Sequence, residues 1–342
     1  NLRKRKFPGF GFCNFALFRH IQFVLMGDTG NSYPHWLGLL KWSLAQTDPD
    51  GSGSDFAEMT RENRDFLDAV MKDIVKDEPG DLQKILEMFQ EMFERGLVSD
   101  DNSRVLNLLE DAQLIVDQID MANVFLKFGG SAVLKNILSS KLLLDDCKCA
   151  ASIICGELAQ NNPTAQAEML KCGLLDQLAV VCATPDTTSK LCAKSLYGIS
   201  CIIRGSEDGE MRFCETIAGP TLLKKLMTRG DALCSKRVMF LANALMMSDY
   251  STPHRVSNIL SGIIPAMYPY LDSPDIDVRE TFLRLLSTAV STAAGVGTLL
   301  PDLPALQDAL AAKLASLQKD DVFEREQIED ILLKIRNEDE LG

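Results

Sequence analysis

Residues 169–204 read MLKCGLLDQLAVVCATPDTTSKLCAKSLYGISCIIR. A short apolar segment ends at Gly173, a second one runs to Val181, and a longer one starts at Ser189. Within the longer segment, residues at helical spacing separate into two faces. One face is Cys192, Leu196, Ile199 and Ile203, and the other is Lys190, Lys194, Tyr197, Cys201 and Arg204. This pattern predicts three consecutive helices, with one face of the third available to a partner.

Similar helix–glycine–helix segments occur four times along the chain. They are FLKFGGSAVLKNIL from Phe125, MLKCGLLDQLAVV from Met169, TIAGPTLLKKLM from Thr216 and ILSGIIPAMYPYL from Ile259. Turns are therefore predicted at Gly130, Gly173, Gly219 and Gly262, which are about 43, 46 and 43 residues apart. This period is typical of armadillo and HEAT units, each of which needs stacked neighbours to bury its apolar face.

A longer third helix is expected between these turns in each repeat, where it would line the concave surface. The expected segments are Lys148–Gln160, Ser189–Arg204, Ser235–Met247 and Asp277–Val290. Two further amphipathic segments, Leu303–Leu317 and Glu324–Arg336, are suited to capping the open end of a solenoid. No strand-like alternation occurs beyond residue 104. The sequence predicts an all-α fold, an armadillo-like right-handed superhelical solenoid of about four three-helix repeats with helical caps.

The pattern also divides the chain into four parts. They are an N-terminal leader and flexible segment (1–54), N-terminal capping helices (55–103), armadillo-like repeats (104–290) and C-terminal capping helices (291–342). In the second part we expect one helix over Met59–Val75, a stop at Pro79–Gly80, and another helix over Asp81–Phe93.

Polar residues at equivalent positions of the third helices recur with the period of the repeats. Glu157, Ser200 and Asn243 are about 43 residues apart, and so are Lys194 and Arg237, and Asn161 and Arg204. Any one such residue is more often part of a solvated helix face than of a binding site. The whole set predicts a polar ladder that crosses neighbouring repeats and contacts a partner.

Composition and motifs argue against several classes of function. The net charge of −13 disfavours a nucleic-acid binder, which usually carries a net basic face. The three histidines form no catalytic dyad or triad, and no phosphate-binding glycine loop occurs, so we expect neither an enzyme nor a cofactor. The ten cysteines lack the spacing of a zinc site and lie mostly in apolar helix patterns, which indicates reduced core thiols and no bound metal. No apolar run is long enough for a membrane span.

Four stretches carry a resemblance to a known family. They are LLKWSLAQTD from Leu39, MTRENRDFLDAVM from Met59, ELAQNNPTAQAEML from Glu157 and SLYGISCIIRG from Ser195. Together they resemble nucleotide exchange factors of the Hsp70-binding-protein and Fes-type family over nearly all of residues 37–290. The resemblance implies a co-chaperone whose concave face binds the ATPase domain of a heat shock protein 70 (Hsp70) chaperone and promotes ADP release. It implies contacts for Gln160, Asn161, Tyr197, Arg204 and Asn243, to which the ladder adds Glu157, Lys194 and Arg237.

The resemblance also bears on the N-terminal segment. In the family this segment competes for the chaperone's peptide-binding groove, and LGLLKWSL, residues 37–44, has the apolar character that such a groove accepts. A helix docked on the solenoid is an equally open interpretation of these residues. We expect Met26 to be the natural start and the protein to act as a monomer in the cytoplasm or nucleus. The alternative function is a generic armadillo-type adaptor without exchange activity.

Overall fold

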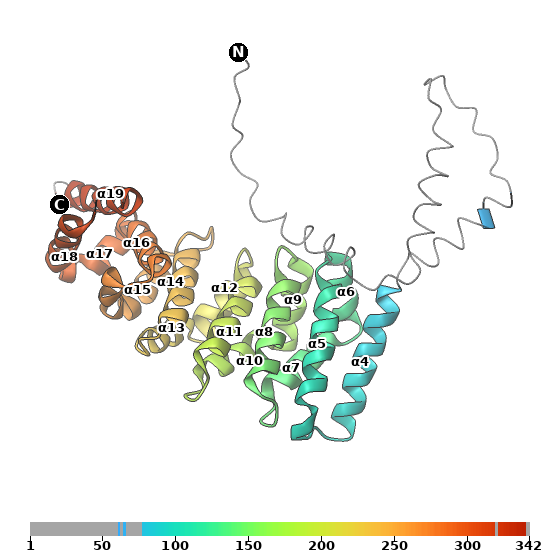
Figure 1. Ribbon diagram of the computed structural model, residues 1–342. Helices are drawn as coiled ribbons and strands as arrows, with labels where there is room; N and C mark the ends of the chain where they lie inside the picture. The colour runs from blue at the N-terminus through green and yellow to red at the C-terminus, as the bar shows by residue number, and fades with distance from the viewer. Residues whose placement is uncertain (1–60, 62–63, 66–76, 319–320, 340–342) are drawn as a thin grey trace, which may run out of the picture. The chain divides into compact units, whose positions relative to one another are not determined.

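The computed structural model describes residues 77–318 and 321–339, together with residues 61, 64 and 65. The chain divides into two units, residues 1–77 and 78–342, and the second holds the helices labelled in Figure 1. Segment 37–44 and most of the predicted helix Met59–Val75 lie outside the described residues. The four-part domain division therefore stays a prediction.

Helices joined by short turns make up the second unit, and the described residues contain no strand. The first helices are α4 (Glu78–Glu94), α5 (Asn102–Val116), α6 (Ile119–Lys127), α7 (Gly130–Ser139), α8 (Asp145–Ala159), α9 (Pro163–Cys172), α10 (Leu174–Ala183) and α11 (Ser189–Ile203). They are followed by α12 (Glu207–Met211), α13 (Gly219–Met227), α14 (Ala232–Met246), α15 (Pro253–Met267), α16 (Ile276–Val290), α17 (Ala293–Leu299), α18 (Leu303–Ser316) and α19 (Val322–Asp339). Short 3₁₀ segments occur at Ser99–Asp101, Tyr268–Asp272 and Leu300–Asp302, and a π-helical segment at Arg212–Thr216.

The four predicted third helices correspond to α8, α11, α14 and α16, and the two predicted C-terminal helices correspond to α18 and α19. The sequence pattern missed α17, a short helix between them. No single described helix is long and apolar enough to cross a membrane. Only α16 taken together with α17 and α18, across a bend of 109°, meets that test by length and composition.

Side-chain caps start several of these helices where the sequence supplies a short polar residue. Asn162 accepts a hydrogen bond from the Ala165 amide at the start of α9, where Pro163 occupies the first turn. Thr188, Asp231 and Thr252 cap α11, α14 and α15 in the same way, because their side-chain oxygens satisfy amide groups that have no partner within the helix. Local sequence thus determines where α9, α11, α14 and α15 begin.

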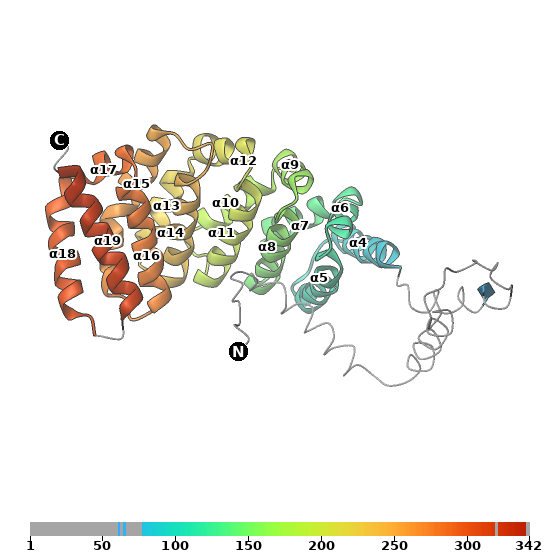
Figure 2. The same cartoon turned by 90° about the horizontal axis from the view of Figure 1, so that it is seen from above.

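The repeats stack so that equivalent helices become neighbours. The third helices α8, α11, α14 and α16 pack side by side, with α5 before them and α19 after them. A second row consists of α7, α10, α13, α15 and α17, and a third row of α6, α9 and α12. Figure 2 shows the third helices along the inner side of a shallow arc within this unit. The inner row therefore offers a continuous surface from α5 to α16.

The core lies between these rows and is formed by the apolar stripes of the helices. Cys192, Leu196, Ile199 and Ile203 of α11 are fully buried, as their spacing predicts. The assignment of Cys201 to the partner-facing stripe is wrong, because this side chain is only 5% exposed. Its thiol lies beside the side chains of Tyr197 and Arg204, and Gln166 of α9 donates a hydrogen bond to the Cys201 carbonyl.

The turns between the first two helices of each repeat depend on a left-handed residue. Gly173 adopts φ +78° there, as predicted, but in the neighbouring repeats the left-handed residue lies one position before the predicted glycine. It is Gly129 with φ +90° before α7 and Ala218 with φ +56° before α13. Gly130 and Gly219 instead start their helices, where a side chain would overlap a phenylalanine ring.

Gly262 departs from its predicted role, and Pro79–Gly80 take part in the start of the next helix. Gly262 lies inside the continuous helix α15, and a Cβ atom there would lie 3.1 Å from Cβ of Lys224 on α13. This glycine therefore permits close packing of two helices and makes no turn. Pro79 and Gly80 lie in the first turn of α4, because proline fits the start of a helix, where its missing amide costs no hydrogen bond.

Replacing Ala218 by glycine is expected to raise the free energy of unfolding by about 0.5–1 kcal/mol. Alanine is strained at φ +56°, whereas glycine adopts this conformation readily. Urea denaturation followed by circular dichroism measures the change. The control is Ala311→Gly in exposed α18, which should lower stability by about 0.5–1 kcal/mol because glycine weakens a helix interior. A loss of stability in Ala218→Gly would contradict the strain argument.

Candidate protein-binding surface

Tyr197 lies at the centre of the predicted ladder and connects three neighbouring third helices. Its ring lies against Gly156 of α8, so closely that a Cβ atom on that glycine would overlap it. Its hydroxyl donates a 3.5 Å hydrogen bond to Oε1 of Gln160, the residue that ends α8. From α14, the guanidinium carbon of Arg237 lies 5.9 Å from the ring centroid, within range of a cation–π interaction. Burial raises the pKa of Tyr197, so this side chain remains a neutral donor at physiological pH.

Glu157 lies one turn before Gln160 and is half-buried. Gln113 of α5 donates a 2.8 Å hydrogen bond to one of its carboxylate oxygens, which extends the surface to a fourth helix. Burial raises the pKa of Glu157, while the Gln113 bond and the nearby charge of Lys194 act in the opposite direction. Its second oxygen, Oε2, is buried without a hydrogen-bond partner.

Two equivalent positions share this property with Glu157. Ser200 Oγ on α11 and Asn243 Oδ1 on α14 are also buried without a hydrogen-bond partner. The three residues are the members of the ladder that recur about every 43 residues, so the same position in three adjacent repeats holds an unsatisfied polar atom. Buried polar atoms without partners are uncommon and costly in folded proteins.

An apolar part of the surface lies beside the ladder toward the end of α14. The guanidinium carbon of Arg204 lies 5.4 Å from the centroid of the exposed Phe240 ring. The Asn243 amide contacts Met247 Sδ at 3.7 Å, and 68% of Met247 is exposed. Exposed Phe and Met next to Arg are typical of protein interfaces. The surface therefore combines cationic, aromatic and amide groups without any catalytic arrangement.

The structure brings most of the predicted site residues together. Tyr197 contacts Gln160 on one side and Arg237 on the other. Lys194 acts on Glu157 through its charge alone. Asn161 is exposed in the left-handed turn between α8 and α9, with φ +55°, which gives it a local role as a turn residue as well. The binding role of all eight residues stays a prediction.

Sequence reasoning missed four residues of this surface, namely Gln113, Gly156, Phe240 and Met247. Gly156 offered a signal, because a glycine inside a helix costs stability and usually permits a close approach. Phe240 also offered one, since it follows Arg237 by three positions and so shares its helix face. Gln113 offered none, because its partner Glu157 is 44 residues away along the chain.

The described residues carry no group suited to holding a metal ion. No cluster of three or more His, Cys, Asp or Glu occurs in them, and the nine described cysteines are free thiols. Seven of these cysteines are buried, and burial raises the pKa of most of their thiols, which keeps them protonated and poorly reactive.

Comparisons with known proteins agree on the architecture. No protein-family model matches the chain, and no curated protein matches it in sequence. Among solved structures, a designed armadillo repeat protein bound to the peptide (KR)4 matches with a TM-score of 0.59 and 13% identity, covering 76% of this chain and 100% of that one. The fold is an armadillo-repeat solenoid.

Two more solved structures match to a similar extent. Another designed armadillo repeat protein matches with a TM-score of 0.57 and 12% identity, over 76% of this chain and all of that one. An engineered protein solved by a structural genomics consortium matches with a TM-score of 0.60 and 17% identity, over 77% and 100%. At this identity the likeness establishes the armadillo fold alone. The predicted fold class is confirmed. The ladder residues lie on the third helices of the repeats or directly after them.

Proposed function

We propose that this chain is a nucleotide exchange factor for an Hsp70 chaperone and binds the ATPase domain through the inner surface of its third helices. One observation carries the proposal. Two of the four stretches that carry the family resemblance, 157–170 and 195–205, are separate in sequence but meet at the Tyr197–Gln160 hydrogen bond. Residues that the family resemblance implies as contacts thus form one surface and are not scattered over the solenoid.

The proposed mechanism needs a rigid surface rather than reactive groups. Stacked third helices, held by Tyr197 against Gly156 and by Glu157 with Gln113, supply that rigidity. If the surface binds better to the chaperone lobe when its nucleotide cleft is open, ADP affinity must fall by the same factor. A coupling of about 1–3 kcal/mol would weaken ADP binding about 5- to 150-fold. Because the proposed partner is a cytosolic chaperone, we place the factor in the cytoplasm, with the nucleus as a second location.

Arg204→Glu and Arg237→Glu are each expected to weaken chaperone binding about tenfold or more, since each reverses a charge that rests on an aromatic ring of this surface. Stopped-flow release of a fluorescent ADP analogue from purified Hsp70 measures the effect. Lys171→Glu is the matched control, because it makes the same charge change on exposed α9, outside the third-helix row. Helical content and melting temperature should be unchanged in all three variants.

Two outcomes would contradict the proposal. If the wild-type protein did not accelerate ADP release, it would not be an exchange factor. If Lys171→Glu weakened binding as much as the two arginine variants do, the inner surface would not be the chaperone-binding site.

The second candidate function is an adaptor that binds an extended peptide along the same helices. The specific observation in its favour is the regular row of unsatisfied atoms on Glu157, Ser200 and Asn243, one per repeat. Peptide backbone groups repeat regularly and are able to satisfy such a row. The designed armadillo relative bound to (KR)4 illustrates peptide binding by this fold. Peptide binding without faster ADP release would favour this function. The competition of segment 37–44 for the chaperone's peptide groove stays a prediction.

A further inference from the structure

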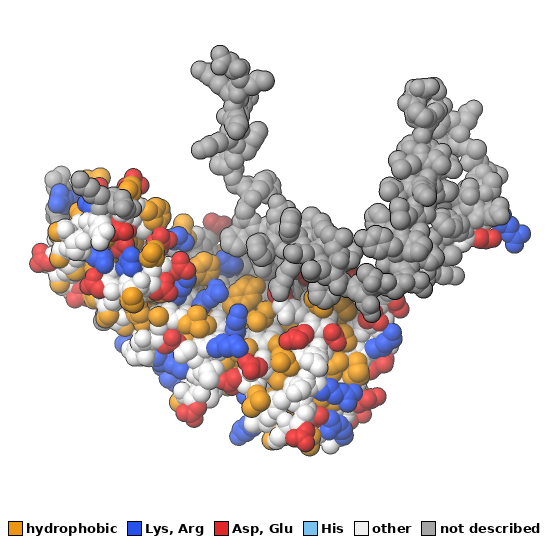
Figure 3. Space-filling view, viewed as in Figure 1, with side chains coloured by type: hydrophobic (Ala, Val, Ile, Leu, Met, Phe, Trp, Pro, Cys, Tyr) orange, Lys and Arg blue, Asp and Glu red, His pale blue; other side chains and the backbone are white. Residues whose placement is uncertain are grey.

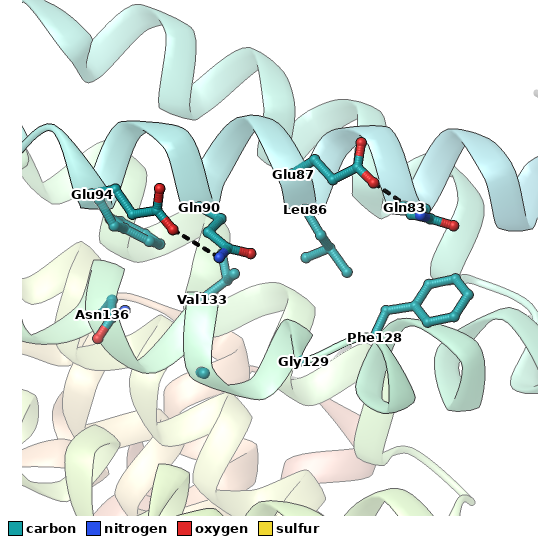
Figure 4. A pocket seen from close by; sticks show the side chains of 11 residues that line it. Gln83, Leu86, Glu87, Gln90, Glu94, Phe128, Gly129, Val133 and Asn136 are labelled. Carbon is teal, nitrogen blue, oxygen red and sulfur yellow. Dashed lines mark hydrogen bonds between the residues drawn. The ribbon is translucent and has the colours of Figure 1, made fainter.

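A groove separate from the third-helix surface lies between α4 and α7. It has a volume of about 690 Å³, a size typical of ligand and peptide pockets. Figure 4 shows side chains of α4 along one edge, with Phe128, Gly129, Val133 and Asn136 on the other. Leu86 and Val133 line the groove but are nearly buried, so its exposed apolar surface comes mainly from Phe93, which is partly buried, and from Phe128, which is 46% exposed. The groove is thus an open trough with an apolar floor.

The edge of the groove formed by α4 is acidic. Glu87 accepts a 2.9 Å hydrogen bond from Gln83, and Glu94 accepts a 2.8 Å bond from Gln90 (Figure 4). These amides orient the carboxylates without neutralising their charge. No Lys or Arg lines the groove, and neither carboxylate forms an ion pair within the described chain. The groove therefore presents two oriented negative charges beside uncovered apolar surface.

The spacing of these charges limits what fits between them. Glu87 and Glu94 are seven residues apart on one helix, which corresponds to about 10.5 Å, or two turns. A helix lying along α4 has the same rise, so its residues at positions i and i+7 would face the two carboxylates. Apolar residues at i+3 and i+4 would then point between them toward Leu86 and Phe128. An acidic or nucleic-acid ligand would be repelled by the same edge.

We propose that the α4–α7 groove is a docking site for an amphipathic helix of a partner protein that carries Lys or Arg at positions i and i+7 around an apolar centre. Charge complementarity to Glu87 and Glu94 selects the basic residues, and burial of the exposed Phe128 ring contributes the apolar contact. The site uses α4 and α7, whereas the proposed exchange surface uses α8, α11 and α14. It therefore stands or falls independently of the exchange function.

The test uses the full chain and a fluorescent helical peptide of about 15 residues, with leucines at the apolar positions and lysines seven apart. Fluorescence anisotropy at low salt measures its affinity, and a second peptide with glutamate in place of both lysines gives the charge dependence. The Lys peptide is expected to bind more tightly. The double variant Glu87→Gln with Glu94→Gln should weaken its binding about three- to tenfold, with a smaller difference at high salt.

Two further variants separate a binding role from a structural one. Glu91→Gln removes a charge from the same helix at an exposed position outside the groove and should leave affinity unchanged. Phe128→Ser should weaken binding more than tenfold without altering helical content, because its ring is already partly in solvent. Equal binding of the two peptides, no detectable binding, or equal losses in Glu91→Gln and the double variant would each overturn the proposal. So would self-association, seen by sedimentation, that the Phe128 variant abolishes.

Discussion

Phe213→Ala is expected to lower the free energy of unfolding by about 3–5 kcal/mol. The Phe213 ring is fully buried and lies over the start of α13, where Gly219 leaves room for it. Truncation would leave a cavity that the stacked helices cannot close. Urea denaturation followed by circular dichroism measures the loss. The control Phe323→Ala, at a ring that is 52% exposed, should cost about 1 kcal/mol or less.

Comparison of the repeats explains why Phe213 and Gly219 belong together. Phe125 lies over Gly130 in the same way one repeat earlier in the solenoid. In the repeat between them the corresponding residues are Met169 and Leu174, both fully buried, so a smaller side chain replaces the ring and a larger one replaces the glycine. The Phe213–Gly219 pair is one residue further apart because the π-helical segment Arg212–Thr216 adds a residue.

Because a smaller residue at the phenylalanine position accompanies a larger one at the glycine position, we expect substitutions at Phe213 and Gly219 to compensate for each other. Gly219→Leu alone should destabilise the protein by about 1–3 kcal/mol, because its side chain would overlap the Phe213 ring. Adding Phe213→Met should recover part of that loss, so the double variant would be more stable than the sum of the two single changes predicts. Strict additivity would show that the two positions do not share space and would contradict the account.

Arg279→Ala is also expected to cost about 3–5 kcal/mol. The Arg279 guanidinium makes a two-pronged contact with Glu324, with Nε at 3.0 Å from Oε1 and Nη2 at 3.0 Å from Oε2. Its Nη1 also donates a 2.8 Å hydrogen bond to the Ser273 carbonyl. Both charged side chains are largely buried, so removing the arginine leaves the carboxylate with little solvent around it and only the Lys313 amine, 4.0 Å away, as an ionic partner. The pair fastens α19 to α16.

Urea denaturation of Arg279→Ala measures this cost, and Arg284→Ala on the exposed face of the same helix is the control, with an expected change within about 0.5 kcal/mol. Arg279→Met combined with Glu324→Leu should be much less destabilising than Arg279→Ala alone, since neither charge then remains buried. If Arg279→Ala cost no more than the control, the ion pair would contribute nothing to attaching α19.

The sequence supported the prediction of the helices better than that of the turns. Apolar residues at helical spacing in α11 and α16 identify those helices because each buries one stripe against its neighbours. Two predicted turn positions were wrong by one residue. Gly130 and Gly219 make room for phenylalanine rings, and the left-handed residues are Gly129 and Ala218. The sequence does not reveal whether a glycine is needed for a positive φ angle or for the close packing of a neighbouring side chain.

The contacts of the candidate site also divide into those that the sequence predicts and those that it does not. The repeat period places Lys194 beside Arg237 and Glu157 beside Ser200 on neighbouring helices, which the sequence alone predicts. The period does not indicate that Gln113 binds Glu157, nor that Phe240 lies under Arg204. Those contacts depend on how closely two helices approach, which side chains from distant repeats determine together.

The sequence by itself determined that the repeats are helical, that their helices recur in units of about 43 residues, and which stripe of α11 is buried. These features follow from local periodicity, because each helix hides its own apolar face. Only the tertiary structure decided which polar atoms of Glu157, Ser200 and Asn243 are left without partners, and that an acidic groove lies between α4 and α7. Both depend on the distances between stacked helices, and a one-dimensional pattern carries no such distances.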